Sequence, residues 1–300
     1  NMDKKIPNNT KVVVVGGGVI LGVVAAVALF FKGMYDAFIT FKESLAEGDG
    51  FLTALGKSIK ESGENPYYIN TSLSCLTNPV MGKIGIAPTI GIGNVDLIAP
   101  AILTKLSQLE DIHRSRIDIR LVCHHQHWVY PREAGYKGGA PYFLKIMIDG
   151  EEKTDMYDLD SLMYDAVKMY PEDISFTTVS ASSTIKNLKA LIFDKGIKTH
   201  SPGPNGLPGG YPVILDGNGA KINLPNEISL GEAIKINEES GKLDSIEKIK
   251  KDGTVIFAEY AYEIMKDTLG FKCRSFKPEE SEALAFEQIS LFKQLMKKYI

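Results

Sequence analysis

Three histidines, a cysteine and the single tryptophan of the chain gather within eight residues, Leu121–Trp128, which read LVCHHQHW. Imidazole titrates near neutrality without help and is a common metal ligand, so this cluster suits proton transfer or metal binding. The competing interpretation is that one or two of these histidines are hydrogen-bonded core residues, because structural networks outnumber active sites. The segment therefore predicts a site without deciding which histidine works there.

The histidines follow a predicted strand over 117–123, and a second strand is predicted over 141–148, where Asp149-Gly150 form a turn. The proline- and glycine-rich segment 199–212 contains His200 and is predicted to be a long loop, either functional or joining two domains. Apolar residues at helical spacing predict helices over 34–45, 50–62, 97–109, 156–170, 183–194, 229–240, 255–269 and 279–298.

The composition is that of an ordinary globular protein, with 300 residues, 44% hydrophobic and 24% charged. This length allows one large domain or two that share a cleft. The net charge of −3 gives no reason to expect nucleic acid. Cys75, Cys123 and Cys273 are widely spaced and form no CxxC pair, which argues against a disulfide framework or a zinc ribbon. We therefore expect a reducing, cytoplasmic compartment.

The N-terminal run Val12–Phe31 has twenty residues without a charge, which is long and apolar enough for a transmembrane helix. The alternative is a buried parallel strand that enters a glycine turn, where Gly16, Gly17 and Gly18 would let the backbone approach a pyrophosphate. The dinucleotide fingerprint is incomplete, because Leu21 stands where its third glycine belongs. Both interpretations remain open at this point.

Two further segments belong near a ligand crevice. A strand is predicted over 66–72, and 76–80 (LTNPV) is predicted as the turn at its carboxyl end. In an open parallel sheet this end of the strands faces the ligand. The glycine-rich segment 85–95 (GIAPTIGIGNV) is predicted as a strand or loop beside the same crevice.

The order of these features resembles the superfamily that contains the lactate and malate dehydrogenases and the NAD- and metal-dependent glycosidases. The resemblance implies an α/β fold, with a Rossmann-type parallel-sheet domain over 1–95, apparently incomplete, and an α+β catalytic domain over 96–300. It implies NAD or NADP as the cofactor, held by Gly16–Gly18, with Asn78 near the nicotinamide ribose. It also places His125, three residues before Trp128, at the position of a histidine that takes part in catalysis or metal binding in this superfamily.

In the dehydrogenase branch, a histidine oriented by an aspartate carries the proton, and the resemblance assigns these roles to His125 and Asp96. Ala99 stands where dehydrogenases of 2-hydroxy acids carry an arginine, so a simple 2-hydroxy carboxylate is not the expected substrate. Substrate contacts are expected from Asn94, His124, His127 and His200.

In the glycosidase branch, His125 would instead bind a divalent, Mn-type metal ion. Gly93 stands where that branch has its metal-binding cysteine, and no neutral backbone group replaces a thiolate ligand. Cys123 would reach the site only if its strand bulged. These departures favour the dehydrogenase branch.

The leading hypothesis is an NAD(P)-dependent oxidoreductase that acts at a C–OH of a polar small molecule and forms a homo-oligomer. The alternatives are a glycosidase-like hydrolase, a relative that has lost catalysis, and a membrane-anchored binding protein with 12–31 as its anchor. Gly18 and Asn78 are only about sixty residues apart, whereas two βαβ halves need roughly a hundred or more. We therefore suspect that natural residues are missing near Gly18–Val19.

Overall fold

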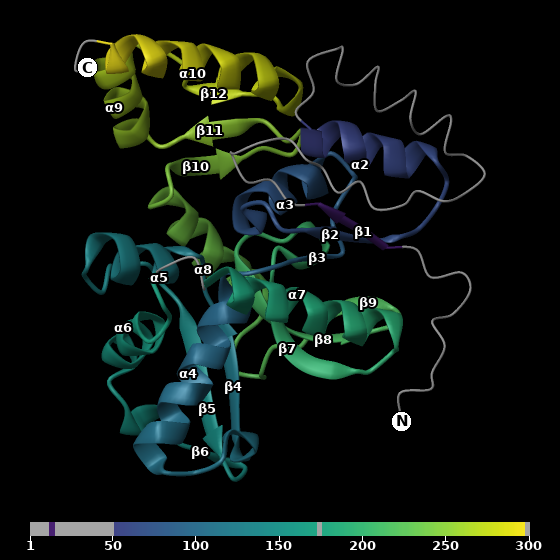
Figure 1. Cartoon of the computed structure of the whole chain (residues 1–300), viewed down its shortest axis with the longest axis vertical. Coiled ribbons are helices and arrows are strands. Elements are labelled where there is room, and N and C mark those ends of the chain that lie inside the picture. The colour runs from purple at the N-terminus through teal and green to yellow at the C-terminus, as the bar shows by residue number, and fades with distance from the viewer. Residues whose placement is uncertain (1–11, 16–50, 173–175, 298–300) are drawn as a thin grey trace.

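The computed structural model describes residues 12–15, 51–172 and 176–297 (Figure 1). Four predictions lie outside these residues: the glycine turn Gly16–Gly18, the rest of the apolar run 16–31, the helix over 34–45 and the suspected join at Gly18–Val19. Among the helices in the described ranges, none is long and apolar enough to cross a membrane.

One small sheet is parallel. It has the order β1-β2-β3, with β1 at Val12–Val15, β2 at Tyr67–Asn70 and β3 at Ile90–Gly91. Helix α2 (Phe51–Glu61) packs its apolar side chains against the Tyr68 side of this sheet, as its helical spacing predicts. The strand predicted over 66–72 and the helix predicted over 50–62 are thus confirmed.

The other three sheets of the described chain are antiparallel. Their strands are β4 (Ile117–Val122), β5 (Phe143–Ile148), β6 (Glu151–Glu152), β7 (Ile197–Pro202), β8 (Gly210–Asp216), β9 (Gly219–Ile222), β10 (Ile246–Ile249), β11 (Val255–Phe257) and β12 (Ser275–Phe276). The described chain is therefore a mixed helix and sheet structure with a small parallel part, and this does not establish the expected Rossmann-type domain.

The main core forms around β4, which alternates buried and more exposed residues as its sequence predicts. Ile119 and Leu121 are buried there, while Asp118 is exposed. Helices α4 (Val95–Glu110) and α6 (Leu159–Lys168) cover this sheet, and both were predicted. A second core lies between α7 (Phe176–Ile192), β8 and α8 (Leu230–Lys242).

The C-terminal end of the chain packs as a separate layer at the top of Figure 1. There α9 (Glu259–Leu269) and α10 (Ser281–Met296) accompany the sheet β10-β11-β12. The single helix predicted over 255–269 is wrong at its start, because the run Val255–Phe257 pairs as β11 with its two neighbours. The short helices are α5 (Gln126–Val129), η1 (Arg114–Arg116), η2 (Tyr130–Ala134), η3 (Thr154–Met156), η4 (Pro204–Gly206) and η5 (Pro278–Glu280).

The predicted turn over 76–80 is also wrong, because these residues lie inside helix α3 (Ser74–Lys83). A proline within a helix leaves the carbonyl four residues earlier without its usual donor. For Pro79 that carbonyl belongs to Cys75, and the backbone N–H of Gly209 donates to it at 3.3 Å. A partner outside the helix therefore replaces the bond that the proline removes.

The predicted loop 199–212 is instead the tip of the β7–β8 hairpin, with η4 between the strands. Two of its prolines lie within the strands, where Pro202 pairs with Gly210 and Pro212 with His200, whereas Pro204 begins η4. Gly203 has a φ of +56°, and its N–H donates to Gly209 O at 2.6 Å, which closes the hairpin.

Candidate functional site

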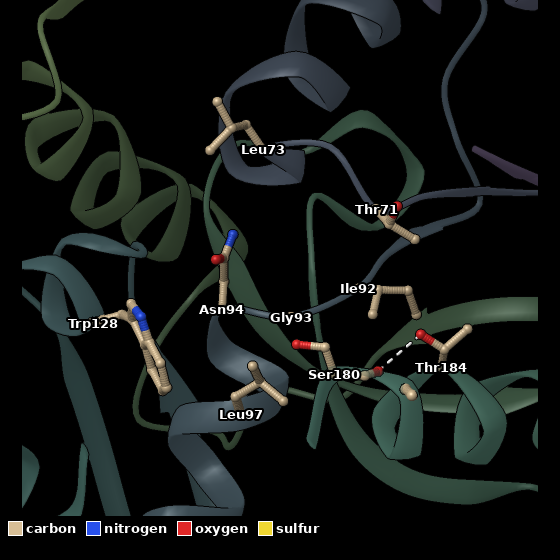
Figure 2. Close-up of a pocket in the computed structure, with 10 residues that line it drawn as sticks. Thr71, Leu73, Ile92, Gly93, Asn94, Leu97, Trp128, Ser180 and Thr184 are labelled. Atoms are coloured by element: carbon tan, nitrogen blue, oxygen red, sulfur yellow. Dashed lines mark hydrogen bonds between the residues drawn. The ribbon is translucent and has the colours of Figure 1, made fainter. Parts of the chain in front are cut away.

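A pocket of about 430 Å³ opens beyond the carboxyl ends of β2 and β3 (Figure 2). Thr71 follows β2 directly, and Ile92–Asn94 follow β3. Figure 2 shows Asn94 between Trp128 on one side and Thr71 and Ile92 on the other. The complete lining is Thr71, Leu73, Ile92, Gly93, Asn94, Leu97, Trp128, Ser180, Ala181 and Thr184. A lining that mixes apolar side chains with an amide and three hydroxyl groups is typical of a site for a polar small molecule.

The backbone between β3 and α4 shapes the floor of this pocket. Gly93 and Asn94 both have a positive φ, +86° and +51°, and a Cβ added at Gly93 would meet no atom within 4 Å. Position 93 therefore borders open space. Asn94 lines the pocket, and its Nδ2 donates to the sulfur of Cys75 at 3.2 Å. Asn94 thus connects the pocket with the groups below it.

Cys75, His124 and His125 form a buried cluster, in which one ligand atom of each lies within 4.8 Å of the other two. Cys75 comes from the first turn of α3, and the two histidines follow β4. The three residues are at most 6% exposed, and the two imidazole rings lie 4.4 Å apart. Nδ1 of each ring is buried and has no hydrogen-bond partner among the described residues.

Asp244 supplies the negative charge beside this cluster. Its Oδ2 lies 3.2 Å from His125 Nε2, in an ion pair rather than a well-directed hydrogen bond, and Gln126 Nε2 donates to its Oδ1 at 2.8 Å. Burial lowers the pKa of His125, but the contacts with Asp244 and Cys75 outweigh burial and raise it to about 10. Burial and the neighbouring imidazoles hold the pKa of His124 well below its usual range. One imidazole of the pair is thus charged and the other neutral.

Asp96, the expected partner of His125, has its hydrogen bonds elsewhere. Its carboxylate accepts from Asn187 Nδ2 and Thr199 Oγ1, each at 3.0 Å, and also from Ser183 and Lys186. It therefore joins α4, α7 and β7 inside the core. The carboxylate beside His125 is Asp244, which has no signal in the sequence because nothing there links it to the histidines.

Three other predicted site residues make structural contacts. Asn78 donates to Gly203 O at 2.9 Å and accepts from Asn70 at 2.7 Å. His127 packs edge-on against a tyrosine ring and is 3.5 Å from a backbone carbonyl, while burial lowers its pKa. His200 accepts from the Leu121 N–H at 3.1 Å, and burial lowers its pKa to about 3. None of the three lines the 430 Å³ pocket.

A second pocket of about 360 Å³ lies on the other side of the cluster, between α3, η4, α8 and β10. Cys75 and His124 both reach it, beside Lys83, Asn237 and Glu238. The sequence misses Cys75 as a site residue, because the thiol meets the histidines only through tertiary packing. Cys123 is buried and forms a β-bridge with Gly210, and it is not in the cluster.

No protein-family model matches this sequence, and no curated protein sequence matches it. Among solved structures, the chain is similar to a malate dehydrogenase from Aeropyrum pernix, at 12% identity and a TM-score of 0.47, over 79% of this chain and 74% of that one. It is also similar to a lactate dehydrogenase from a Medee basin deep-sea metagenome library, at 13% identity and 0.45, over 78% and 74%. A minor L-lactate dehydrogenase from Enterococcus mundtii matches at 13% and 0.43, over 79% and 75%. Likeness of this extent assigns neither a family nor an activity.

Proposed function

We propose that the chain is an NAD(P)-dependent oxidoreductase that acts at a C–OH of a polar small molecule. The observation that supports this is the 430 Å³ pocket beyond the carboxyl ends of two parallel strands, where open α/β sheets bind their ligands. In this proposal β1 leads into Gly16–Gly18 as the nucleotide side of a Rossmann-type domain over 1–95. Residues 96–300 form the substrate side, and the boundary falls at the start of α4.

The residues of the chain would position the substrate and handle one proton. Asn94 is the polar contact at the floor of the pocket, and Leu97 and Trp128 exclude water from its wall. His125, whose charged form the contact with Asp244 favours, would donate its proton to the carbonyl oxygen in the direction of reduction, with Asp244 in place of Asp96 as its carboxylate partner. A bound nicotinamide would supply the hydride to the carbonyl carbon, so that hydride and proton together would complete the two-electron reduction to the C–OH. A cytoplasmic location and a homo-oligomer remain predictions.

A second candidate is an NAD- and metal-dependent glycosidase-like hydrolase. The observation that favours it is the sulfur of Cys75, which lies beside His124 and His125. This sulfur could take the place of the metal-binding cysteine that is absent at Gly93. Activity lost to a chelator, without net turnover of the nucleotide, would distinguish this hydrolase from the oxidoreductase.

The test is nucleotide binding by the purified full chain, with NAD and NADP side by side. Trp128 is the only tryptophan and lines the pocket, so its fluorescence reports directly on occupancy. We expect one nucleotide to change this signal saturably and substrate to change it further. Asn94→Gly keeps the positive φ and removes the amide, so it should weaken the substrate response about tenfold, the effect of losing one hydrogen bond of about 1.4 kcal/mol.

Asn218→Ala is the matched control, because this asparagine is exposed in the turn between β8 and β9 and lies outside the pocket. It should bind both ligands like the unchanged protein. Absence of binding by either nucleotide would remove the oxidoreductase and the glycosidase-like hydrolase together.

A further inference from the structure

The cluster of Cys75, His124 and His125 has buried polar atoms that the described protein does not satisfy. Nδ1 of His124 and Nδ1 of His125 both lack a hydrogen-bond partner, although the two residues are 1% and 6% exposed. A buried polar group without a partner costs about 1–3 kcal/mol, and native proteins leave few such groups. Two on adjacent residues, beside a thiol, indicate that something else binds there.

We propose that Cys75, His124 and His125 bind a borderline transition-metal ion such as Zn²⁺ through one sulfur and two imidazole nitrogens. The three ligand atoms already lie within 4.8 Å of one another. Bonds of roughly 2.0–2.3 Å in tetrahedral geometry put such ligands roughly 3.3–3.6 Å apart. Rotation of the side chains that moves the ligand atoms by about an ångström closes this difference without a change in the backbone.

The groups around the cluster match those that support metal ligands. A histidine ligand usually offers its other ring nitrogen to a carboxylate, which fixes the orientation of the ring. His125 does so through Nε2, which faces Asp244, and Asp244 is itself held by Gln126. Asn94 Nδ2 donates to the sulfur of Cys75, a hydrogen bond that stabilises a thiolate. The orientation of both the sulfur and one imidazole is thus set before an ion arrives.

The ligand types select the ion. One sulfur and two imidazoles favour Zn²⁺, Co²⁺ or copper, whereas Mn²⁺ and Mg²⁺ prefer oxygen ligands. This differs from the Mn-type metal that the sequence resemblance implies. Three protein ligands leave a fourth position, and Cys75 and His124 line the 360 Å³ pocket. An ion with an open position beside a pocket is typical of catalytic rather than purely structural zinc.

The inference goes beyond the proposed oxidoreductase and does not depend on it, because no nucleotide takes part. A nitrogen of His125 that binds a metal cannot carry the substrate proton at the same time, so the two roles are separable by experiment. The same residues could also form a Cys–His–Asp nucleophile, which needs no ion. The test therefore includes a measurement that separates a ligand from a nucleophile.

The experiment uses the full chain, stripped with a chelator and titrated with Co²⁺ and with Zn²⁺ in the absence of nucleotide. We expect one ion per chain and a thiolate-to-cobalt charge-transfer absorption. Cys75→Ser should abolish this absorption and weaken binding about 100-fold or more, and Asp244→Asn should weaken binding about 10–100-fold while it keeps the absorption. Cys273→Ser, which changes a cysteine outside the cluster, is the matched control and should bind like the unchanged chain.

A second measurement needs no variant, so it holds even if Cys75→Ser fails to fold. The unchanged chain is treated with iodoacetamide, with and without saturating Zn²⁺, and labelling is read peptide by peptide. Bound Zn²⁺ should protect Cys75 and leave Cys273 unaffected. Three results would each overturn the proposal: failure to bind either ion, a charge-transfer absorption that persists in Cys75→Ser, or equal labelling of Cys75 with and without Zn²⁺. Rapid labelling of Cys75 that does not depend on Zn²⁺ would point to the nucleophile instead.

Discussion

His200→Gln should make the protein less sensitive to acid. The Nε2 of His200 accepts a hydrogen bond from the Leu121 N–H, which requires that nitrogen to be unprotonated. Burial, with help from Lys186 and Arg120, lowers the pKa of His200 from 6.5 to about 3 in the folded chain. The unfolded chain therefore binds this proton more readily, and stability falls as the pH drops below about 6.5.

The size of the effect follows from the two pKa values. Each pH unit between them costs about 1.4 kcal/mol, so acidification from about pH 7.5 to about pH 5 should remove about 2 kcal/mol of unfolding free energy through this residue alone. Glutamine keeps an acceptor for the Leu121 N–H but does not titrate.

The assay is denaturant unfolding of the unchanged chain and of His200→Gln at both pH values. The loss of unfolding free energy on acidification should be about 2 kcal/mol smaller in the variant. His113→Gln changes an exposed histidine and should leave that loss unaltered. Parallel losses in the unchanged chain and in His200→Gln would refute the reasoning and return His200 to the candidate ligand contacts.

Asp96→Asn should lower the unfolding free energy by about 2 kcal/mol, because it breaks a buried ion pair whose lysine is only partly exposed. Asp165→Asn, in an exposed pair, should change it by less than about 1 kcal/mol, and equal effects in the two would contradict the core role of Asp96. Gly206→Ala should cost about 3 kcal/mol in the same assay, because φ is +78° and the new Cβ would lie 2.7 Å from Gly82 Cα. Gly63→Ala, at φ +65° with nothing within 4 Å, isolates the backbone strain and should cost about 1 kcal/mol.

Local patterns predicted most of the described elements. The alternation in β4 and the helical spacing of α2 and α6 reflect burial on one face, which the chain encodes locally. The β7–β8 hairpin was missed because its prolines and glycines normally exclude strands. Its pairing depends instead on neighbours that local sequence does not reveal, including a neighbouring strand, β9, and the close approach of α3.

The candidate site was predicted in part. The segment LVCHHQHW led to the two histidines of the cluster, but the family resemblance gave Asp96 as the partner of His125. Three-dimensional packing supplies Asp244 and Cys75, each from an element far away in sequence. A short motif therefore locates the histidines at the end of a strand. The thiol and the carboxylate that change the pKa of His125 come from tertiary contacts, which no local pattern contains.

The contacts of Asp244 also have a consequence for the order of folding. Gln126 and Asp244 are 118 positions apart, so the charge beside His125 arrives only after a long segment has been ordered. Closing so large a loop is slow, and it has to occur before Asp244 can form its stabilising contacts with Gln126 and His125. On a ribosome, a nascent chain would expose LVCHHQHW well before its carboxylate is synthesised. The histidine pair would therefore reach its final charge state late, after the segments around Gln126 and Asp244 have come together.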